Sequence, residues 1–241
     1  MAKILNSNTQ FLDGPNARGA EFRFAFKVFR QFINGFRKLH FIGPCITVFG
    51  SARFDENHPD YILAREIGRE IAEMGFTTMT GGGPGIMEAA NRGAFENDGY
   101  SVGCSIHLPN EQVVNPFMHR YVHFEHFFVR KTLLLKYSYA FVVMPGGFGT
   151  LDELFETLTL IQTGIINNFP VVIMGKDFYR EIRHHIQNMI DRGTISKKDE
   201  NLVLFTDEVP EAIEHIRKYV LENYKVKNKR IRPRWWLFEK E

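Results

Sequence analysis

The sequence predicts an α/β protein, a Rossmann-like doubly wound parallel sheet flanked by helices in a single domain. Short apolar runs rich in β-branched residues alternate with longer segments whose apolar residues recur at helical spacing. Three glycine-bearing stretches fall where a predicted strand gives way to a predicted helix, which is where ligands bind in this architecture. The 241 residues are enough for one such domain with a substantial core.

Strands and helices are predicted to alternate along most of the chain, with a loop containing Pro109 and Pro116 in the middle. The predicted strands are Ile46–Phe49, Phe76–Met79, Val102–Ile106, Ala140–Met144, Val171–Met174 and Val203–Phe205. The predicted helices are Tyr61–Met74, Ile86–Asn97, Phe127–Tyr137, Leu151–Gln162, Tyr179–Asp191 and Pro210–Asn223. Because this alternation is typical of βαβ units, we expect parallel strands with helices on both faces of the sheet.

The three glycine-bearing stretches are Gly50-Ser51, Gly81–Gly85 and Gly146–Gly149. Each follows a predicted strand, so all three are expected at the rim formed by the carboxyl ends of the strands. Backbone N–H groups at a helix start suit one terminal phosphate, through amide donors and the helix dipole. The sequence therefore predicts a site for a monophosphate at this rim.

Two other nucleotide sites are disfavoured by the glycine spacing. The dinucleotide fingerprint requires glycine at its sixth position, which is Ile86 in one loop and Asp152 in the other. No Gly-Lys-Ser/Thr follows either loop, so a Walker P-loop is absent. An alternative without any ligand stays open, because Thr150 to Glu153 matches the capping box that starts a helix.

The two ends of the chain differ from the middle. We expect an N-terminal extension with an amphipathic helix over residues 1–43, a Rossmann-like nucleotide-binding domain over 44–223 and a basic, aromatic tail over 224–241. The phenylalanines of the N-terminal helix are expected to pack on the domain or on a second subunit, with a membrane surface as the alternative. The tail is interpreted as a strap whose Trp235 and Trp236 dock on the protein, with single-stranded nucleic acid as the less favoured partner.

Composition sets further limits. The formal charge is +2, so the overall field selects no anionic partner. Cys45 and Cys104 lack the spacing of a disulfide framework or metal knuckle, which predicts reduced core thiols and a cytoplasmic protein. No apolar run reaches the roughly 20 residues of a membrane span. His119, His123 and His126 complete no zinc motif, so no metal site is expected.

Three segments together resemble the Lonely guy family of cytokinin riboside 5′-monophosphate phosphoribohydrolases. They are GGGPGIMEAANRGA from Gly81, VRK from Val129 and PGGFGTLDE from Pro145. The likeness covers roughly Ile46 to Phe205. The chain departs from plant-type members at Glu88, where they commonly have glycine.

The resemblance implies hydrolysis of the N-glycosidic bond of a nucleoside 5′-monophosphate, giving free base and ribose 5-phosphate. It implies Arg130 and Glu153 as catalytic residues. It also implies a set of residues that contact the substrate. These are Gly146, Gly147, Gly149, Thr150, Lys131, Gly50, Ser51, Gly82 and Gly83. Cleavage through an oxocarbenium-like sugar suits a carboxylate near the anomeric carbon, and a guanidinium suits positioning and charge balance.

The resemblance also bears on cofactors and partners. Some relatives carry the label lysine decarboxylase, which implies pyridoxal phosphate, but nothing in this sequence identifies a Schiff-base lysine, and no cofactor is expected. A homodimer or larger assembly is implied. The alternative function is a non-catalytic carrier of a nucleotide or cofactor on the same fold, as in related molybdenum cofactor carriers.

Overall fold

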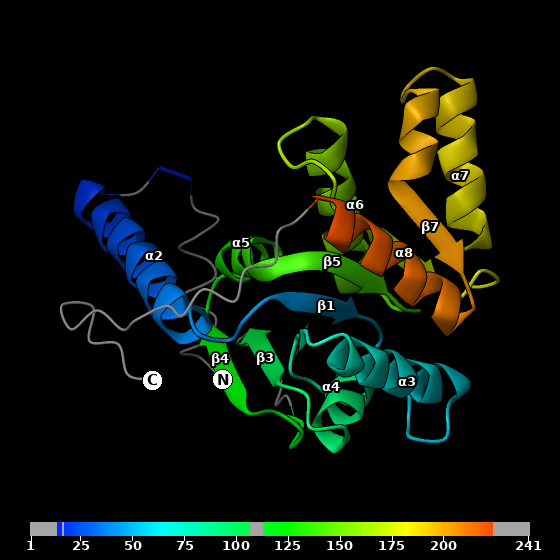
Figure 1. The fold of residues 1–241 in the computed structure, drawn as a ribbon. Helices are drawn as coiled ribbons and strands as arrows, with labels where there is room; N and C mark the ends of the chain where they lie inside the picture. Colours follow the sequence, from blue (N-terminus) through cyan, green and yellow to red (C-terminus); the bar gives the residue numbers. More distant parts are fainter. Residues whose placement is uncertain (1–13, 16, 107–112, 224–241) are drawn as a thin grey trace.

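The computed structural model describes residues 14–15, 17–106 and 113–223 (Figure 1). Its centre is a seven-stranded sheet in the order β4-β3-β2-β1-β5-β6-β7, and every neighbouring pair is parallel. The strands are β1 (Cys45–Phe49), β2 (Thr77–Thr80), β3 (Ser101–Ile106), β4 (Arg120–Phe124), β5 (Ser138–Val143), β6 (Val171–Met174) and β7 (Val203–Thr206). The predicted fold class is confirmed.

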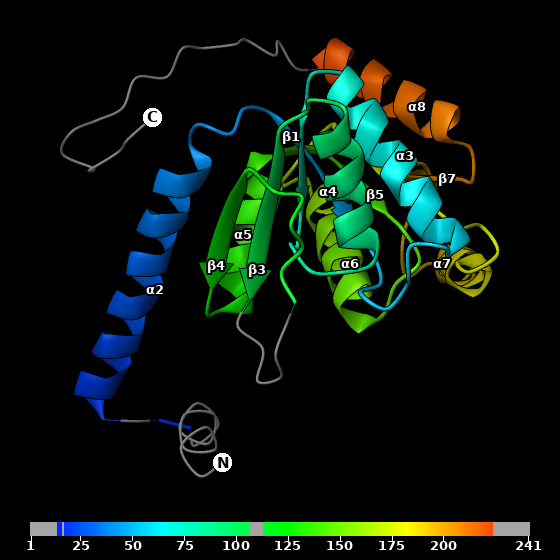
Figure 2. The same cartoon turned by 90° about the horizontal axis from the view of Figure 1, so that it is seen from below.

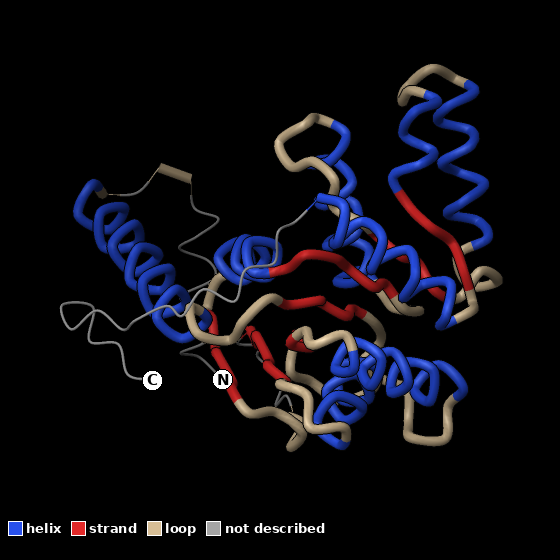
Figure 3. Tube along the Cα trace, viewed as in Figure 1, coloured by secondary structure: helices blue, strands red, loops and turns tan. Residues whose placement is uncertain are grey.

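Helices cover both faces of this sheet, as Figures 2 and 3 show. They are α2 (Arg18–Leu39), α3 (Pro59–Glu73), α4 (Ile86–Glu96), α5 (Phe127–Tyr137), α6 (Phe148–Gln162), α7 (Arg180–Asp191) and α8 (Val209–Asn223), with a short 3-10 helix η1 (Lys197–Leu202). The apolar residues of α3, α4 and α8 pack on one face of the sheet, and those of α5 and α6 pack on the other.

The two cores follow from the alternation of side chains along each strand. In β1, Ile46 and Val48 face the layer of α3, α4 and α8, whereas Cys45 and Phe49 face the layer of α5 and α6. Both faces of the central strands are therefore buried, which explains why these strands appear in the sequence as nearly continuous apolar runs. Cys45 and Cys104 are buried free thiols, as predicted.

Strand β4 was not predicted, because its residues were assigned to the loop before Phe127. Its sequence is RYVHF, in which only Val122 and Phe124 are fully buried. β4 lies at the edge of the sheet, so one face packs on the core while Tyr121 and His123 lie on the other side. An edge strand with alternating polar residues carries a weak apolar signal, and this explains the error.

The N-terminal helix is only partly packed against the domain. Leu39 and Gly35 of α2 are buried, and Val28, Phe32 and Phe36 contact the core beneath α5 and β4. Nearer the start of the helix, by contrast, exposed phenylalanines include Phe22, Phe26 and Phe29. The expectation that the phenylalanines pack on the domain or on a second subunit is thus confirmed for Phe32 and Phe36, and it stays a prediction for the exposed phenylalanines.

The contact between α2 and the domain leads to a stability prediction. A Cβ at Gly35 would overlap Leu133 Cδ1 and lie 3.1 Å from Phe124 Cε1. We expect Gly35→Val to lower the free energy of unfolding by about 1–3 kcal/mol, because the added methyl groups force the helix away from α5. Thermal unfolding measures this, with Gly19→Ala as the control, since nothing lies within 4 Å of a Cβ at Gly19. An unchanged midpoint for Gly35→Val would contradict the close contact.

Other sequence predictions fall partly outside the described residues. The tail over 224–241, with its tryptophans, and the first 13 residues lie outside them. No helix among the described residues is long and apolar enough to cross a membrane.

Candidate functional site

The three glycine-bearing loops meet at one rim of the sheet. Ser51 N–H donates to Pro145 O at 2.9 Å, and Ile86 N–H donates to Ser51 O at 2.9 Å. Ser51 thus joins the loop after β1 to the loops after β5 and β2. A Cβ at Gly50 would overlap Ile86, so the contact also requires glycine there. β1 and β5 flank the point where the strand order reverses, which is where doubly wound sheets bind ligands.

Helix α6 begins earlier than predicted. Its first residue is Phe148 and its N-cap is Gly147, with no side-chain cap, so the predicted capping box at Thr150 and Glu153 is wrong. Thr150 is the third helical residue, and its N–H donates to Gly147 O at 3.0 Å. The Thr150 side chain is instead buried against Gly146, where a Cβ would overlap its hydroxyl. The glycines let the helix start three residues earlier because they allow the chain to turn without a side chain in the way.

The start of α6 has the features of an anion site. The backbone N–H groups of the first residues of a helix point outward without intrahelical partners, and the helix dipole places positive charge there. No acidic side chain occupies the first turn of α6. Gly147 and Gly149 are exposed, and nothing lies within 4 Å of a Cβ built on either of them. Space for a ligand therefore remains open beside these N–H groups.

Tyr179 supports the loop before α6 and was not predicted as a functional residue. It is fully buried, and its hydroxyl donates to Met144 O at 2.8 Å. Burial raises the pKa of this phenol, so it stays protonated as a donor. The sequence signal was weak, since Tyr179 sits at the start of a helix, far along the chain from the loop it supports.

Glu153 and Arg130 face each other below the rim. Glu153 lies in the second turn of α6 and is only 5% exposed. Arg130 of α5 places Nη1 4.0 Å from Glu153 Oε1, while its Nε–H donates to Cys104 O at 2.8 Å. A Cβ at Gly81 would lie 2.8 Å from Arg130 Nη2, so the guanidinium also adjoins the loop after β2. The structure brings these two predicted catalytic residues together.

The protonation of Glu153 is unusual for a glutamate. Burial raises the pKa of its carboxyl from 4.5 to about 7, although Arg130 and Lys131 favour the ionised form and act in the opposite direction. At neutral pH the group is therefore present in both forms. A carboxyl poised near the operating pH suits proton transfer or charge stabilisation, and perturbed groups of this kind cluster at functional sites.

Lys131 has different partners from Arg130, its neighbour in sequence. Its ammonium lies 2.9 Å from Asp152 Oδ2 and 2.9 Å from Glu156 Oε2, both on α6. Burial disfavours its charged form, but the hydrogen bonds to these carboxylates outweigh that effect and raise its pKa. The lysine predicted to touch substrate is thus engaged by two carboxylates.

A buried polar network supports the loop after β2, and sequence reasoning missed it. Asn91 of α4 accepts from Thr80 Oγ1 at 2.5 Å and donates to Ser101 Oγ at 2.7 Å. Asn115 donates to Asn91 Oδ1 at 3.1 Å and to Gly83 O at 3.0 Å. Asn91 was detectable as a polar residue on the buried face of its helix, whereas nothing near Asn115 signals its burial.

Glu88, the departure from plant-type relatives, has a partner in α3. It accepts a hydrogen bond from the Tyr61 hydroxyl at 3.0 Å. The bond joins the first turn of α4 to the neighbouring helix. The carboxylate at this position therefore contributes to packing between two helices of the same layer.

The histidines of the β4 region have separate partners. His119 Nδ1 accepts from Ser101 N–H at 3.2 Å, His123 Nδ1 lies 2.9 Å from Ser105 Oγ, and His126 Nδ1 lies 2.8 Å from Gln31 Nε2. Within the described ranges, no group of three or more His, Cys, Asp or Glu side chains is arranged to hold a metal ion.

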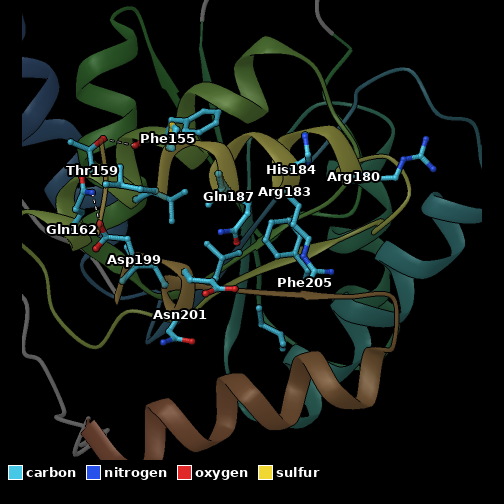
Figure 4. Close-up of a pocket in the computed structure, with 18 residues that line it drawn as sticks. Phe155, Thr159, Gln162, Arg180, Arg183, His184, Gln187, Asp199, Asn201 and Phe205 are labelled. Atoms are coloured by element: carbon cyan, nitrogen blue, oxygen red, sulfur yellow. Dashed lines mark hydrogen bonds between the residues drawn. The ribbon is translucent and has the colours of Figure 1, made fainter. Parts of the chain in front are cut away.

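A cavity of about 620 Å³ lies between α6, α7 and β7, away from the glycine loops (Figure 4). Its apolar walls include Phe155 of α6 and Phe205 of β7, and the guanidinium of Arg183 lies 5.7 Å from the centre of the Phe205 ring. None of the predicted site residues lines it.

Known proteins similar to this chain include phosphoribohydrolases. A model of the family described as "Possible lysine decarboxylase" matches residues 87–216, just over half of the chain. A cytokinin riboside 5′-monophosphate phosphoribohydrolase of Arabidopsis thaliana is 26% identical over 190 residues, which cover 77% of this chain and 87% of the relative. One from Rhodococcoides fascians is 28% identical over 180 residues, covering 71% and 88%.

Solved structures point to the same fold. A molybdenum cofactor carrier protein of Chlamydomonas reinhardtii matches with a TM-score of 0.54 and 26% identity, covering 74% of this chain and 98% of that one. Similar proteins therefore include both named hydrolases and named carriers.

Proposed function

The chain belongs to the Lonely guy family, whose model is described as possible lysine decarboxylase, and from that premise we propose that it hydrolyses the N-glycosidic bond of a nucleoside 5′-monophosphate. The products are the free base and ribose 5-phosphate. The observation that carries the proposal is the pairing of Glu153, buried and with a pKa of about 7, with Arg130 beneath an open, glycine-lined helix start.

The phosphate binds at the start of α6 in this proposal. The N–H groups of Gly147 and Gly149 and the dipole of the helix hold it, and the buried Thr150 shapes the corner together with Gly146. The loops at Gly50-Ser51 and Gly82-Gly83 form the other walls. Binding energy from a phosphate that does not react then orients the bond that does.

Glu153 and Arg130 act on the sugar. As the glycosidic bond breaks, the anomeric carbon gains positive charge, and the ionised Glu153 stabilises that charge or orients the attacking water. The guanidinium of Arg130 positions the ribose phosphate and balances the charge of the carboxylate. Water supplies the hydroxyl of the ribose product, and its proton goes to the departing base.

Lys131, the lysine of the family motif, does not support the description lysine decarboxylase. Pyridoxal phosphate would need an unprotonated lysine to form an imine. Lys131, beside Arg130, has its pKa raised by hydrogen bonds to Asp152 and Glu156 that outweigh the effect of burial. Its ammonium therefore does not fit that role, and no decarboxylation is proposed.

A substrate panel tests the proposal. Purified protein is incubated with AMP, GMP, CMP, UMP and isopentenyl-AMP, and release of the base is followed by chromatography. We expect release from at least one monophosphate and much slower release from adenosine, which lacks the phosphate anchor. No release from any monophosphate would leave the hydrolase proposal without support.

The second candidate is a carrier that binds a nucleotide-like molecule without cutting it. The likeness to the molybdenum cofactor carrier favours it, whereas the paired Arg130 and Glu153 favour hydrolysis. To distinguish the two candidates, active protein is kept with the nucleotide for several days, and the molecule bound to the protein is then recovered. Intact nucleotide would support the carrier, and free base would support the hydrolase.

We also propose that the protein works as a homo-oligomer. Phe22, Phe26 and Phe29 of α2 are 74%, 54% and 59% exposed, and with Ile33 they follow the 4-3-4 spacing of a helix–helix seam. A second copy of the chain covers this stripe in the proposal. Sedimentation should give an assembly for the wild type and smaller particles for Phe26→Ser with Phe29→Ser. A monomeric wild type would overturn it.

A further inference from the structure

Two adjacent cations on α5 meet two sets of carboxylates on α6. Arg130 faces Glu153 at 4.0 Å, and Lys131 binds Asp152 and Glu156, each at 2.9 Å. Successive residues of a helix point about 100° apart, so Arg130 and Lys131 leave α5 in different directions. The two helices are therefore joined by two sets of charges side by side, one facing the site and one facing outward.

The outer set differs from an ordinary surface ion pair. Asp152 and Glu156 are half exposed, whereas the Lys131 side chain is only 13% exposed. Exposed pairs contribute little to stability, whereas a largely buried cation needs its partners. Two of its three N–H donors are already used by carboxylates.

We propose that Lys131 is a positioning residue, whose ammonium binds Asp152 and Glu156 and holds α6 against α5 so that Glu153 faces Arg130, and that it does not contact the substrate. This assignment replaces the substrate contact implied by the family motif. Its consequence for the reaction rate rests on the proposed function, but its consequence for Glu153 can be measured without any substrate.

The charges around Glu153 give the direction of the expected effect. The groups that act on its carboxyl are Arg130 and Lys131 of α5, which lower its pKa, and Asp152 and Glu156 of α6, which raise it. Removing Lys131 takes away one cation that lowers the pKa of Glu153. The two carboxylates that raise this pKa remain, and they are no longer paired with the ammonium of Lys131. The pKa of Glu153 should then rise.

The test is the titration of Glu153 followed by NMR of the protein labelled with ¹³C at glutamate carboxyls, with Glu153→Gln to assign the signal. We expect Lys131→Met to raise the pKa of Glu153 by about one unit, a tenfold change in proton affinity. Lys131→Arg keeps the cation and should restore the wild-type value. Asp152→Asn with Glu156→Gln should lower it, and this variant remains informative if Lys131→Met does not fold.

Lys136→Met is the matched control on the same helix. Its ammonium lies 5.9 Å from the centre of the Phe36 ring and 5.8 Å from that of Tyr137, on the contact with α2. The control should leave the pKa of Glu153 unchanged. An equal shift in this variant would mean that any lost cation has the effect, and the proposal would be overturned.

Binding of ribose 5-phosphate, measured by calorimetry, separates positioning from substrate contact. For Lys131→Met we expect its Kd to change by less than about threefold while the pKa of Glu153 rises. A loss of tenfold or more with an unchanged pKa would make Lys131 a phosphate ligand and overturn the proposal. If the wild type releases no base but the pKa shift is found, the hydrolase proposal fails and the positioning role stands.

Discussion

Glu153→Gln is expected to lower kcat for base release by about 10²–10⁴, the usual contribution of a positioned carboxyl group in acid–base catalysis. Gln keeps the size of the side chain but cannot carry the negative charge that faces Arg130. KM for the monophosphate should change little, because the phosphate is held at the start of α6 and not by this residue. Steady-state kinetics at pH 7 with AMP, or with the best substrate of the panel, measures both constants.

Glu153→Gln lowers activity in this prediction, but it should make the folded protein more stable at neutral pH. The pKa of Glu153 is about 7 in the folded protein, whereas the ordinary value of 4.5 applies to the unfolded chain. The folded state therefore binds the proton more tightly than the unfolded state. Stability therefore falls as pH rises from 4.5 to 7, by about 3 kcal/mol in total. Gln does not titrate, so the variant does not lose this stability as the pH rises. Unfolding in denaturant should show the variant gaining about 3 kcal/mol on the wild type between pH 4 and pH 8.

These two measurements separate a catalytic carboxyl from a structural one. A residue that only holds the helix would lose stability on substitution and would leave kcat almost unchanged. Glu73→Gln, the same substitution at a half-exposed carboxylate of α3 that pairs with Arg69, is the control and should keep kcat within a few fold. If Glu153→Gln keeps full activity, the carboxyl has no role in the chemistry.

Gly149→Ala is expected to lower kcat/KM by about 10²-fold while the protein stays as stable as the wild type or becomes more stable. The second position of α6 has nothing within 4 Å of a new Cβ, so the fold accepts the methyl group. Ala also favours the helical conformation by up to about 1 kcal/mol. The methyl group would instead displace a phosphate held against the backbone, and a misplacement of about 1 Å can cost 10²-fold in rate.

Gly19→Ala is the control for this prediction. Gly19 is also the second residue of its helix and also has nothing within 4 Å of a Cβ, but it lies in α2, away from the rim. It should leave kcat/KM unchanged and affect thermal unfolding in a similar way. If Gly149→Ala is as active as Gly19→Ala, the phosphate does not bind at the start of α6.

Much of the architecture follows from local patterns. The strand before each glycine loop and the helix after it were predicted from apolar runs and helical spacing, and α5 was predicted from Phe127 to Tyr137 with the bounds that the structure has. These signals are local because the apolar pattern of a buried parallel strand or of an amphipathic helix lies within consecutive residues. Elements whose stability depends on distant partners were harder, and β4 and the first turn of α6 were misassigned for that reason.

By itself, the sequence determined the order of strands and helices, the rim at which the glycine loops gather and the residue types available there, since each depends on neighbours along the chain. Only the tertiary structure decided the protonation of Glu153, the partners of Lys131 and the support from Asn91, Asn115 and Tyr179. These properties arise from burial and charge between segments far apart in sequence. Arg130 and Lys131 are adjacent cations in the sequence. They leave α5 in different directions, and this is why their proposed roles differ.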